Sequence, residues 1–461
     1  MLPGPFPNLR RAEMVRIKVK DPVDCQILEG IDLLLPALSY QSETYTKVQW
    51  GNKRVPKRKS FIRGLKSGDF FFTGFLHRIQ EYCKNNNIEY KIEDSKELIN
   101  FLIADHEPHI EGKNLREGKW AYQYDLIQNA VYFQRGIIKA ATGSGKTAMM
   151  LGFISCYSNA SVLFLCNTHT PISQLKLALK DSGLKQRIDV STIQSFYRKK
   201  PKEYINEYDI IIIDECHEGL RSGKSMYAKV LRNSLAPIRL GFTATLPDND
   251  ADRMTMEGLL GPVIGELTIQ EGIERKVLAK PKVIIKKLPD NNGLRDYRSY
   301  QDVYHHGVVA NRALNRQIVM DAIEDSKEGP VLILVTEIEH GENIIDMAAR
   351  IYDREFTFVR GETEKDLREA VRQMMISGDV DIVVATAVFK KGLDVPNLSS
   401  VILAFGGKSN SQTVQAIGRG TRNVDGTKEY VIIRDYFNSS SYHLIKHFGH
   451  RLCLYMEEGW L

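Results

Sequence analysis

Residues 140–147 read AATGSGKT, and this stretch determines more of the expected fold than any other part of the chain. The apolar pair 137–138 (II) precedes it, and the largely apolar run 148–154 follows it. The pattern predicts a strand, a glycine-rich turn and a helix. Gly143 and Gly145 would let backbone N–H groups close around phosphate oxygens at the helix N-terminus. The stretch therefore indicates a nucleotide-binding site where a strand ends.

The remaining residues of this phosphate loop define a candidate cofactor site. Lys146 is placed to reach the β- and γ-phosphates, and the Thr147 hydroxyl to join the coordination shell of a Mg²⁺ ion. Thr142 and Ser144 complete the loop. Ala140 departs from the general pattern, which has glycine at that position. On this motif alone, a glycine-rich loop that binds no nucleotide is the alternative.

A second motif makes the nucleotide interpretation stronger. Residues 209–217 read DIIIIDECH, which is an apolar strand ending in two carboxylates. Asp214 can hold Mg²⁺ directly or through water, and Glu215 can orient or deprotonate the attacking water. Continuous isoleucine runs are typical of strands covered on both faces. We therefore expect the loop and the carboxylates to converge, with their strands as neighbours in one parallel sheet.

Length and composition describe an ordinary globular protein of two or three domains. The chain has 461 residues, of which 43% are hydrophobic and 26% charged. Its six cysteines form no CxxC pair, which argues against a structural metal site and indicates a reducing compartment. The first residues lack the apolar core of a secretory signal, and no apolar stretch is long enough to span a membrane. We expect an intracellular protein without a membrane partner.

The net charge of +6 is concentrated in one place. Between Lys47 and Lys66, a basic segment holds eight lysines and arginines and no acidic residue. Such clustering predicts a polyanion-binding surface, although a solvated face is the alternative. Trp50 and Phe61 could stack on bases, but Phe61 more readily joins a small core with 70–75. The candidate nucleic-acid contacts in this segment are Lys53, Arg54, Lys57, Arg58, Lys59 and Arg63.

The order of apolar and polar stretches predicts three folded parts. Residues 1–112 show short strand-like pieces and one helical stretch, which predicts a small α+β domain. Residues 113–265 and 282–461 each alternate apolar strands with helix-length segments, which predicts two doubly wound parallel-sheet lobes joined by a connector at 266–281. The expected strands of the first lobe are 137–139, 162–166, 189–192, 210–213 and 238–242, and those of the second are 283–285, 331–335, 356–359, 382–385, 400–403 and 429–433.

A basic motif gives the second lobe a role. Residues 415–422 read QAIGRGTR, in which Arg419 and Arg422 stand three residues apart on one side of a predicted helix. Both guanidinium groups could reach the γ-phosphate held by the other lobe. A contact of this kind is worth about 10³ to 10⁵ in rate. Hydrolysis would then require closure of the lobes.

Taken in order, these motifs resemble those of superfamily 2 helicases and translocases over about residues 117–437. AATGSGKT is similar to motif I, DECH to motif II, 243–245 (TAT) to motif III, 386 with 391–396 (KGLDVP) to motif V, and QAIGRGTR to motif VI. The resemblance implies RecA-like lobes and hydrolysis of ATP with Mg²⁺, carried by Lys146, Glu215, Arg419 and Arg422. A nucleic-acid-binding scaffold without catalysis is the alternative of a different class, but all the catalytic residue types are present.

The same resemblance assigns the remaining candidate residues. Tyr122 and Gln123 would read adenine, and Gly392 and Asp394 would link nucleotide and DNA. The coupling residues would be His217, Thr243, Ala244, Thr245 and Gln415. For His217, a hydrogen-bonded structural histidine is the alternative. The positions that follow the nucleic-acid strand are Asn167, Thr168, Thr192, Gln194 and Thr386. The first of these motifs departs from the usual Pro-Thr pattern, since Asn167 and Pro171 stand there with Gln174 retained.

The amino-terminal part resembles the small domain of phage branch-migration helicases of the UvsW kind at 57–63 (KRKSFIR), 72–79 and 88–91 (IEYK). Unwinding costs about 1.4 kcal/mol per base-pair step, whereas branch migration replaces each broken pair. We therefore expect an ATP-dependent DNA motor that remodels forks, R-loops, D-loops or Holliday junctions in replication, recombination and repair. A phage origin would place it in bacterial host cytoplasm. An RNA helicase or a restriction- or chromatin-type duplex translocase remains the alternative; the sequence indicates no protein partner.

Overall fold

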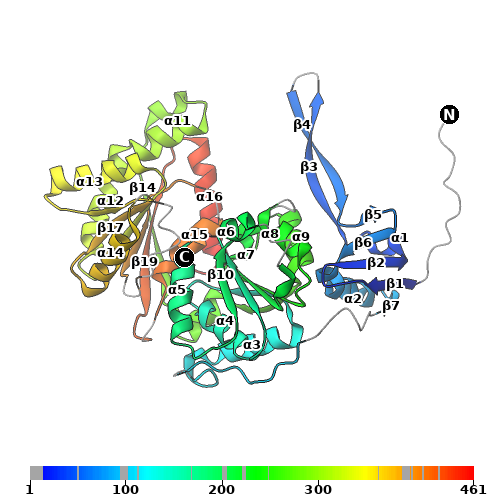
Figure 1. Cartoon of the computed structure of the whole chain (residues 1–461). Helices are drawn as coiled ribbons and strands as arrows, with labels where there is room; N and C mark the ends of the chain where they lie inside the picture. Colours follow the sequence, from blue (N-terminus) through cyan, green and yellow to red (C-terminus); the bar gives the residue numbers. More distant parts are fainter. Residues whose placement is uncertain are drawn as a thin grey trace. The chain divides into compact units, whose positions relative to one another are not determined.

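The structure is a computed structural model, and it describes residues 14–48, 51–93, 102–111, 114–167, 169–199, 205–220, 225–247, 249–361, 363–386, 395, 398–407, 410–423 and 426–461. The chain forms two compact units. The first comprises Met1–Ala140 and Thr147–Glu266, and the second comprises Ala141–Lys146 and Leu267–Leu461. Each unit contains a six-stranded sheet, and the first also holds a smaller mixed sheet (Figure 1). The predicted fold class, two α/β lobes after a small α+β domain, is confirmed.

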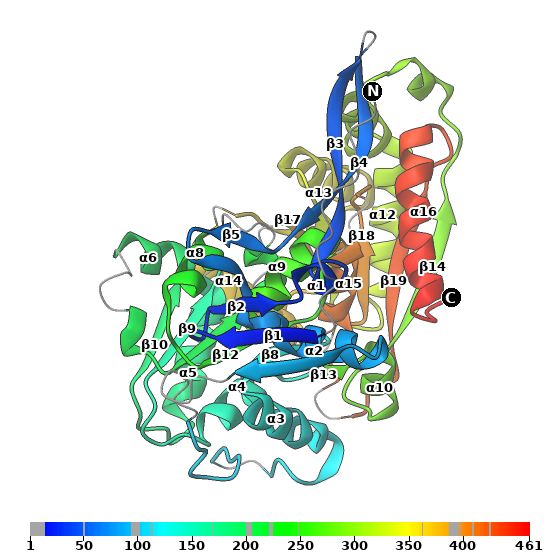
Figure 2. The same ribbon diagram turned by 90° about the vertical axis from the view of Figure 1, so that its right-hand side faces the viewer.

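The mixed sheet is built from alternating sequences near the N-terminus. Its strand order is β5 (Arg63–Leu65), β6 (Gly68–Phe72), β2 (Asp24–Glu29), β1 (Met14–Val19) and β7 (Glu89–Glu93). Every second residue of β1 is buried, as a strand with one covered face requires. β1 and β2 run antiparallel (Figure 2), whereas β1 and β7 are parallel. Helix α2 (Leu76–Asn85) covers this sheet with Ile79 and Cys83.

A two-stranded ribbon projects from this domain (Figure 1). It consists of β3 (Ser39–Val48) and β4 (Gly51–Ser60), which pair antiparallel from Ser39 opposite Ser60 to Val48 opposite Gly51. The sequence predicted a strand at 43–50, which overlaps β3, and no strand over β4. The second coincides with much of the basic segment, whose charged residues lack the apolar alternation that signals a half-buried strand.

The first six-stranded sheet has the order β10, β9, β11, β12, β8, β13. Its strands are β8 (Arg135–Ala140), β9 (Val162–Cys166), β10 (Ile188–Thr192), β11 (Ile210–Asp214), β12 (Ile238–Thr243) and β13 (Val263–Leu267). Its helices are α3 (Tyr122–Phe133), α4 (Lys146–Ile154), α5 (His169–Lys180), α6 (Ile193–Arg198), α7 (Cys216–Gly219), α8 (Met226–Asn233) and α9 (Asp250–Leu260). Strands β8 to β12 are parallel, and every residue of β9 and β12 is buried. Burial on both faces explains the unbroken apolar sequence of β9. In β12 the buried Arg239 donates to the carbonyl oxygens of Ala236 and Leu231.

The mixed sheet and the parallel sheet of the first unit share one hydrophobic core. A Cβ added at Gly258 of α9 would lie 2.7 Å from the Phe75 ring, and one added at Gly74 would lie 2.3 Å from the Glu257 carbonyl oxygen. Arg78 of α2 donates to Glu257 at 2.7 Å. The half-buried Arg135 donates to the carbonyl oxygen of Pro22. Such close packing makes the two sheets of this unit one body.

The second unit contains a parallel sheet with the order β14, β19, β18, β15, β17, β16. Its strands are β14 (Lys280–Lys287), β15 (Val331–Val335), β16 (Thr357–Val359), β17 (Ile382–Thr386), β18 (Ser400–Leu403) and β19 (Tyr430–Phe437). Its longer helices are α12 (Arg312–Asp325), α13 (Ile338–Tyr352), α14 (Lys365–Ser377), α15 (Asn410–Gly420) and α16 (Tyr442–Glu457). The expected connector holds α10 (Ile269–Glu274), whose Thr268 and Glu271 form a capping box.

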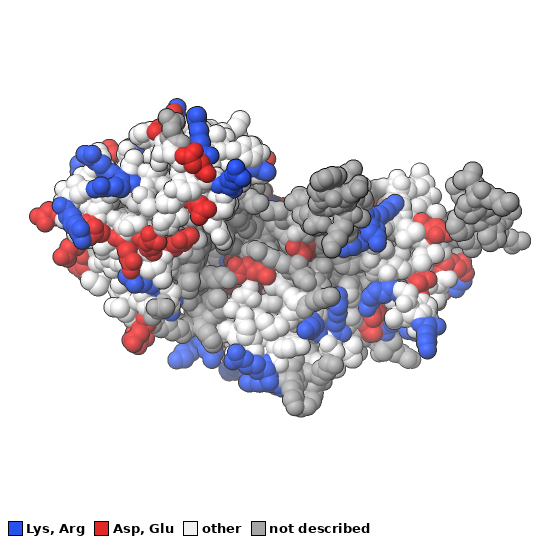
Figure 3. Space-filling view, turned by 90° about the horizontal axis from the view of Figure 1, so that it is seen from above, with Lys and Arg blue, Asp and Glu red and all other residues white. Residues whose placement is uncertain are grey.

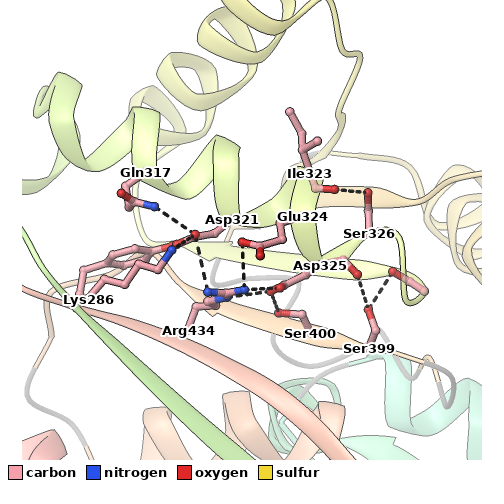
Figure 4. Close-up of polar contacts among 12 residues, drawn as sticks. Lys286, Gln317, Asp321, Ile323, Glu324, Asp325, Ser326, Ser399, Ser400 and Arg434 are labelled. Carbon is pink, nitrogen blue, oxygen red and sulfur yellow. Dashed lines mark hydrogen bonds and ion pairs between the residues drawn. The ribbon is translucent and has the colours of Figure 1, made fainter.

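A buried polar network ties α12 to this sheet (Figure 4). Arg434 of β19 donates to Asp325 from Nε at 2.9 Å, and Ser400 of β18 donates to the same carboxylate at 2.7 Å. Lys286 of β14 pairs with Asp321 one turn earlier on α12. A buried charge is tolerated only with such partners, so removing one of them would be costly. The network therefore fixes how α12 lies on the sheet.

Candidate functional site

The phosphate loop lies between β8 and α4, as the sequence predicted. Gly143 and Gly145 have φ angles of 87° and 78°, a region that residues with a Cβ rarely adopt. The loop residues 141–146 group with the second compact unit. Within that unit, a Cβ added at Gly418 of α15 would lie 2.7 Å from the Thr142 Cβ, and one added at Gly143 would lie 3.6 Å from the Arg422 Cβ. Glycine at these positions permits the close approach.

The carboxylates lie in the same parallel sheet as β8 but not on an adjacent strand. The order β11, β12, β8 puts β12 between them, so the expectation of neighbouring strands was wrong. Asp214 ends β11, and Thr243 ends β12 at the same edge of the sheet. Thr243 thus stands between the strand of the carboxylates and the strand of the phosphate loop.

Glu215 adopts a strained backbone conformation, with φ of 48°. Left-handed conformations are uncommon for residues other than glycine and persist where the surrounding structure fixes them. Its backbone N–H donates to the Asp214 carboxylate at 3.0 Å. The two acidic residues are therefore held in a defined mutual orientation at the strand end.

His217 connects this acidic turn with the end of β12. The side chain is buried, and its Nδ1 lies 2.7 Å from the Thr243 hydroxyl and 3.4 Å from a Glu215 carboxylate oxygen. The Thr243 hydroxyl donates to the Thr245 carbonyl at 2.6 Å, so it must accept from Nδ1–H of His217. The contact joins two of the expected coupling residues. It also agrees with the structural alternative, because the histidine is hydrogen-bonded and packed.

Arg419 and Arg422 lie at the end of α15 and just after it. Arg422 forms an isolated antiparallel bridge with Leu278, and Ala279 N–H donates to the Thr421 carbonyl at 2.6 Å. Burial lowers the pKa of Arg422, and Arg372 lowers it further. A guanidinium that has lost much of its hydration is suited to an anionic ligand.

Two residues that support this arginine segment could not be recognised from the sequence. The Lys428 ammonium donates to the Gly420 carbonyl at the C-terminus of α15, and burial lowers the pKa of Lys428 to about 8. The Asn423 side chain accepts from the Lys428 N–H at 3.2 Å and donates to the Lys428 carbonyl at 2.9 Å. Asn423 and Lys428 follow the 415–422 motif in a turn. Their residue types are common in loops, so nothing in the sequence marks them.

The expected adenine-reading residues lie at the start of α3. Tyr122 and Gln123 are both buried, with exposed fractions of 4% and 3%. The Trp120 and Tyr122 rings lie 6.3 Å apart. The structure thus places an aromatic ring and a side-chain amide together, and their contact with adenine stays a prediction.

Several residues expected to contact nucleic acid have other roles. Thr192 is 3% exposed and caps α6 by accepting from the Ser195 N–H at 3.1 Å, and its contact with nucleic acid stays a prediction. Arg63 pairs with Asp24 and lies 4.3 Å from the centre of the Phe72 ring, so its partly exposed guanidinium is held by contacts within the small domain. Asn167 donates to Glu218 at 2.9 Å.

Other candidates stay available or untested. Gln194 is exposed in α6, and Thr386 is buried at the end of β17. Lys57, Arg58 and Lys59 are all exposed on β4. The face seen in Figure 3 carries separate groups of basic and acidic side chains rather than one continuous basic surface. Thr168, Gly392, Asp394 and Trp50, with the side chains of Lys53, Arg54, Gln174 and Gln415, lie outside the described residues.

Phe61 belongs to the core rather than to a stacking surface. Its ring centre lies 5.4 Å from that of Phe75 and 5.4 Å from that of Tyr40. Phe71 and Phe72 are almost completely buried beside it. The preferred interpretation of this residue is therefore correct.

Comparison with known families decides the identity of the two lobes. Residues 113–248 match the type III restriction enzyme res subunit family, and residues 314–424 match the helicase conserved C-terminal domain. The chain is a superfamily 2 helicase. As such it is an ATP-hydrolysing enzyme.

The helicase is similar over most of its length to proteins from phages and archaea. It is 24% identical over 402 residues to the ATP-dependent DNA helicase uvsW of Enterobacteria phage T4, which covers 80% of this chain and 79% of that protein. It is 27% identical over 359 residues to the DNA 3'-5' translocase XPB2 of Sulfurisphaera tokodaii, which covers 68% and 80%.

A solved structure supports the fold of this helicase. A fragment described as the HsdR subunit of a type I restriction enzyme from Vibrio vulnificus YJ016 superposes with a TM-score of 0.53 at 18% identity, covering 88% of this chain and 89% of that one. The likeness concerns the fold alone. Among the described residues of this helicase, no helix combines the length and the apolar character needed to cross a bilayer.

Proposed function

We propose that this protein is an ATP-dependent DNA motor that remodels branched DNA, such as replication forks, Holliday junctions, R-loops and D-loops. The observation that supports the proposal is the packing of the amino-terminal domain onto the parallel sheet within the first unit. The domain bears the exposed residues Lys57, Arg58 and Lys59 on a projecting ribbon, and it shares a hydrophobic core with the sheet that ends in the acidic motif. Movement of that unit would carry the ribbon with it.

The ATP site is proposed from the residues that the fold holds at the sheet edges. Lys146 would bind the β- and γ-phosphates, and backbone N–H groups of the phosphate loop would bind their oxygens. Thr147 and Asp214 supply the hydroxyl and carboxylate oxygens that suit Mg²⁺, which would neutralise phosphate charge when bound. Glu215 would orient and deprotonate water, and Arg419 and Arg422 would stabilise the charge that develops on the γ-phosphate.

Coupling would pass through the contact between His217 and Thr243. Both residues stand at carboxyl ends of adjacent strands, and their 2.7 Å hydrogen bond joins the acidic turn to the 243–245 segment. A change at Glu215, whose carboxylate lies 3.4 Å from the same ring nitrogen, would reach Thr243 directly. Such a contact would connect the state of the bound nucleotide with the 243–245 segment.

Branched DNA fits this design on energetic grounds. Each base pair costs about 1.4 kcal/mol to break on average, and at a junction each broken pair is replaced by a new one. The motor then supplies direction rather than net unwinding energy. The similarity to the ATP-dependent DNA helicase uvsW of phage T4 supports DNA as the nucleic acid on which this motor acts.

The test compares ATP hydrolysis and strand exchange on different nucleic acids. We expect ATPase stimulation by forks and four-way junctions and ATP-dependent conversion of those junctions. Lys146→Ala or Glu215→Gln should abolish hydrolysis while junction binding persists. Stimulation by single-stranded RNA alone would refute the proposal, and turnover retained in either variant would refute the assigned roles.

A duplex translocase of the restriction type is a second candidate. The match of residues 113–248 to the res subunit family favours it. Displacement of a triplex-forming strand from linear duplex DNA, with no conversion of four-way junctions, would support this candidate against the first.

A further inference from the structure

The second unit has an open cavity of about 360 Å³ that none of the helicase motifs uses. It lies where β14 and β19 end, and these parallel strands are neighbours. Ligands of α/β sheets bind beyond the carboxyl ends of strands, and the volume is within the roughly 300–1,000 Å³ of ligand pockets. The lining residues, Leu294, Arg295, Tyr297 and 439–443, all fall outside the 314–424 range that matches the helicase C-terminal domain.

Tyr297 offers an aromatic ring that is supported from behind. The ring stacks on His306 with centres 4.4 Å apart and planes inclined by 14°. His306 in turn contacts the His305 ring at 4.9 Å, and His305 Nε2 lies 3.1 Å from a Glu339 oxygen. Tyr297 nevertheless keeps 37% of its surface exposed. A ring already held in place loses little freedom when a flat ligand stacks on it.

Tyr442 is the second aromatic side chain of the cavity. It is the first residue of α16, and 72% of its surface is exposed. Folding therefore gains little from this large ring. Exposed aromatic rings beside polar groups are typical of proteins that stack on unpaired bases.

The polar lining suits a phosphate. The Ser439 hydroxyl donates to Asp290, and the Ser440 hydroxyl accepts from the Asn291 N–H at 2.7 Å, so these serines join the two segments that form the cavity. Arg295 is exposed at the rim. Ser441 is the N-cap residue of α16 and forms no side-chain cap hydrogen bond. A guanidinium and a hydroxyl are common donors to phosphate oxygens.

We infer that this cavity binds an unpaired nucleotide of single-stranded DNA, with the base against Tyr297 and Tyr442 and the phosphate at Arg295. The inference rests on the proposed function in taking DNA as the polymer. Paired bases in a duplex are stacked on one another, so only an unpaired base can lie on these rings. The cavity would hold the strand released at a fork or junction.

The test measures binding of the full chain to labelled oligothymidylate by fluorescence anisotropy without ATP. Tyr297→Ala and Tyr442→Ala should each weaken binding about 5-fold to 150-fold, which is the range for loss of one base-stacking contact. Tyr297→Phe and Tyr442→Phe should keep wild-type affinity because stacking needs the ring alone. Tyr430→Ala is the matched control, since Tyr430 is 51% exposed at the opposite end of β19.

Arg295→Ala tests the phosphate contact separately. It should reduce the salt dependence of oligothymidylate binding by about 0.7 in the log–log slope, whereas Arg298→Ala, exposed nearby but outside the lining, should leave it unchanged. Duplex affinity should be the same for all variants.

Wild-type affinity in both alanine variants would overturn the inference, as would an equal loss in Tyr430→Ala or in the phenylalanine variants. Absence of oligothymidylate binding by the wild-type chain would also overturn it. Junction conversion is measured in parallel to separate the two claims. No conversion by the wild-type chain would refute the proposed function. Conversion by the wild-type chain, together with normal oligothymidylate binding by the alanine variants, would refute only the nucleotide site in this cavity.

Discussion

Single residues carry the strongest constraints in this structure. Glu215 holds a backbone conformation that its side chain disfavours, and His217 is buried with its Nδ1–H committed to Thr243. A left-handed backbone at a residue with a Cβ costs stability, whereas a buried hydrogen bond that is made contributes to stability. Both residues follow the carboxyl end of β11, where we propose that ATP is hydrolysed.

Thr243→Val tests the coupling role. The variant keeps the shape of the side chain but leaves the buried His217 N–H without its acceptor, which costs about 1–3 kcal/mol. We expect basal ATP hydrolysis to continue while stimulation by DNA falls at least several-fold. The control is Thr255→Val, which removes a buried hydroxyl that donates to the Ala251 carbonyl at 2.8 Å in the same unit. Equal stimulation in both variants would contradict the coupling role.

His340 should make the second unit sensitive to acid. Burial lowers its pKa from 6.5 to about 4, and its Nε2 lies 2.9 Å from the Asn315 amide oxygen. In the unfolded chain His340 binds a proton below about pH 6.5, whereas in the folded chain it does so only near pH 4. The contribution of the neutral His340 to the free energy of unfolding is therefore fully present above pH 6.5. It falls by roughly 3 kcal/mol as the pH drops from 6.5 to about 4.

Urea unfolding between pH 4 and 7 would measure this effect. His340→Gln should flatten the pH dependence in that window. His77→Gln, which changes a histidine whose side chain is 42% exposed, should leave the profile as in the wild type. Parallel profiles for the wild type and His340→Gln would show that His340 is not the titrating group.

Among the elements, the β3–β4 ribbon is the one expected to contact DNA. Lys57→Ala, Arg58→Ala and Lys59→Ala together should weaken duplex binding equally for all sequences and reduce the salt slope by about 0.9 per lost phosphate contact. Replacing Lys18, Lys20 and Lys91 of the same domain by alanine removes equal charge elsewhere. Equal slopes in both triple variants would identify the ribbon residues as a solvated face.

The elements also show what the sequence could and could not predict. The buried strands β9, β11, β15 and β18 were recognisable because both their faces are covered and their sequences are continuously apolar. The ribbon strand β4 was not, since its residues are charged. Strand order was inaccessible as well, because the sequence does not reveal that β12 runs between β8 and β11. The role of Thr192 as the N-cap of α6 was also inaccessible, because it depends on where that helix begins.

The site was predictable where motifs fix chemistry and not where packing does. Gly143, Lys146 and Asp214 follow from spacing and residue type alone. Lys428 and Asn423 support the arginine segment through one carbonyl and one turn, and Arg78 joins two domains through a single carboxylate. Contacts of this kind depend on tertiary structure, which residue spacing does not encode.

For the whole molecule, the first unit should respond as a single body. Arg78→Ala removes the charged hydrogen bonds to Glu257 and should destabilise the docking of the small domain by about 1.5–3 kcal/mol. Hydrogen exchange should then quicken in both α2 and α9, and junction conversion should fall more than basal hydrolysis. Arg16→Ala breaks ion pairs with Glu29 and Glu93 inside the small domain and is the control. Unchanged exchange in α9 of Arg78→Ala would show that the ion pair does not hold the interface.

The shared core of the first unit limits how this protein can be divided. Deleting the residues before 102 would expose apolar surface around Gly258. It would also remove the Pro22 carbonyl oxygen that accepts from the Arg135 guanidinium. We expect the shortened enzyme to aggregate rather than to fold as a minimal ATPase. The amino-terminal domain is therefore part of the folding unit of the first lobe. A relative that lacks this domain would need polar residues on the face of α9 that the domain covers here.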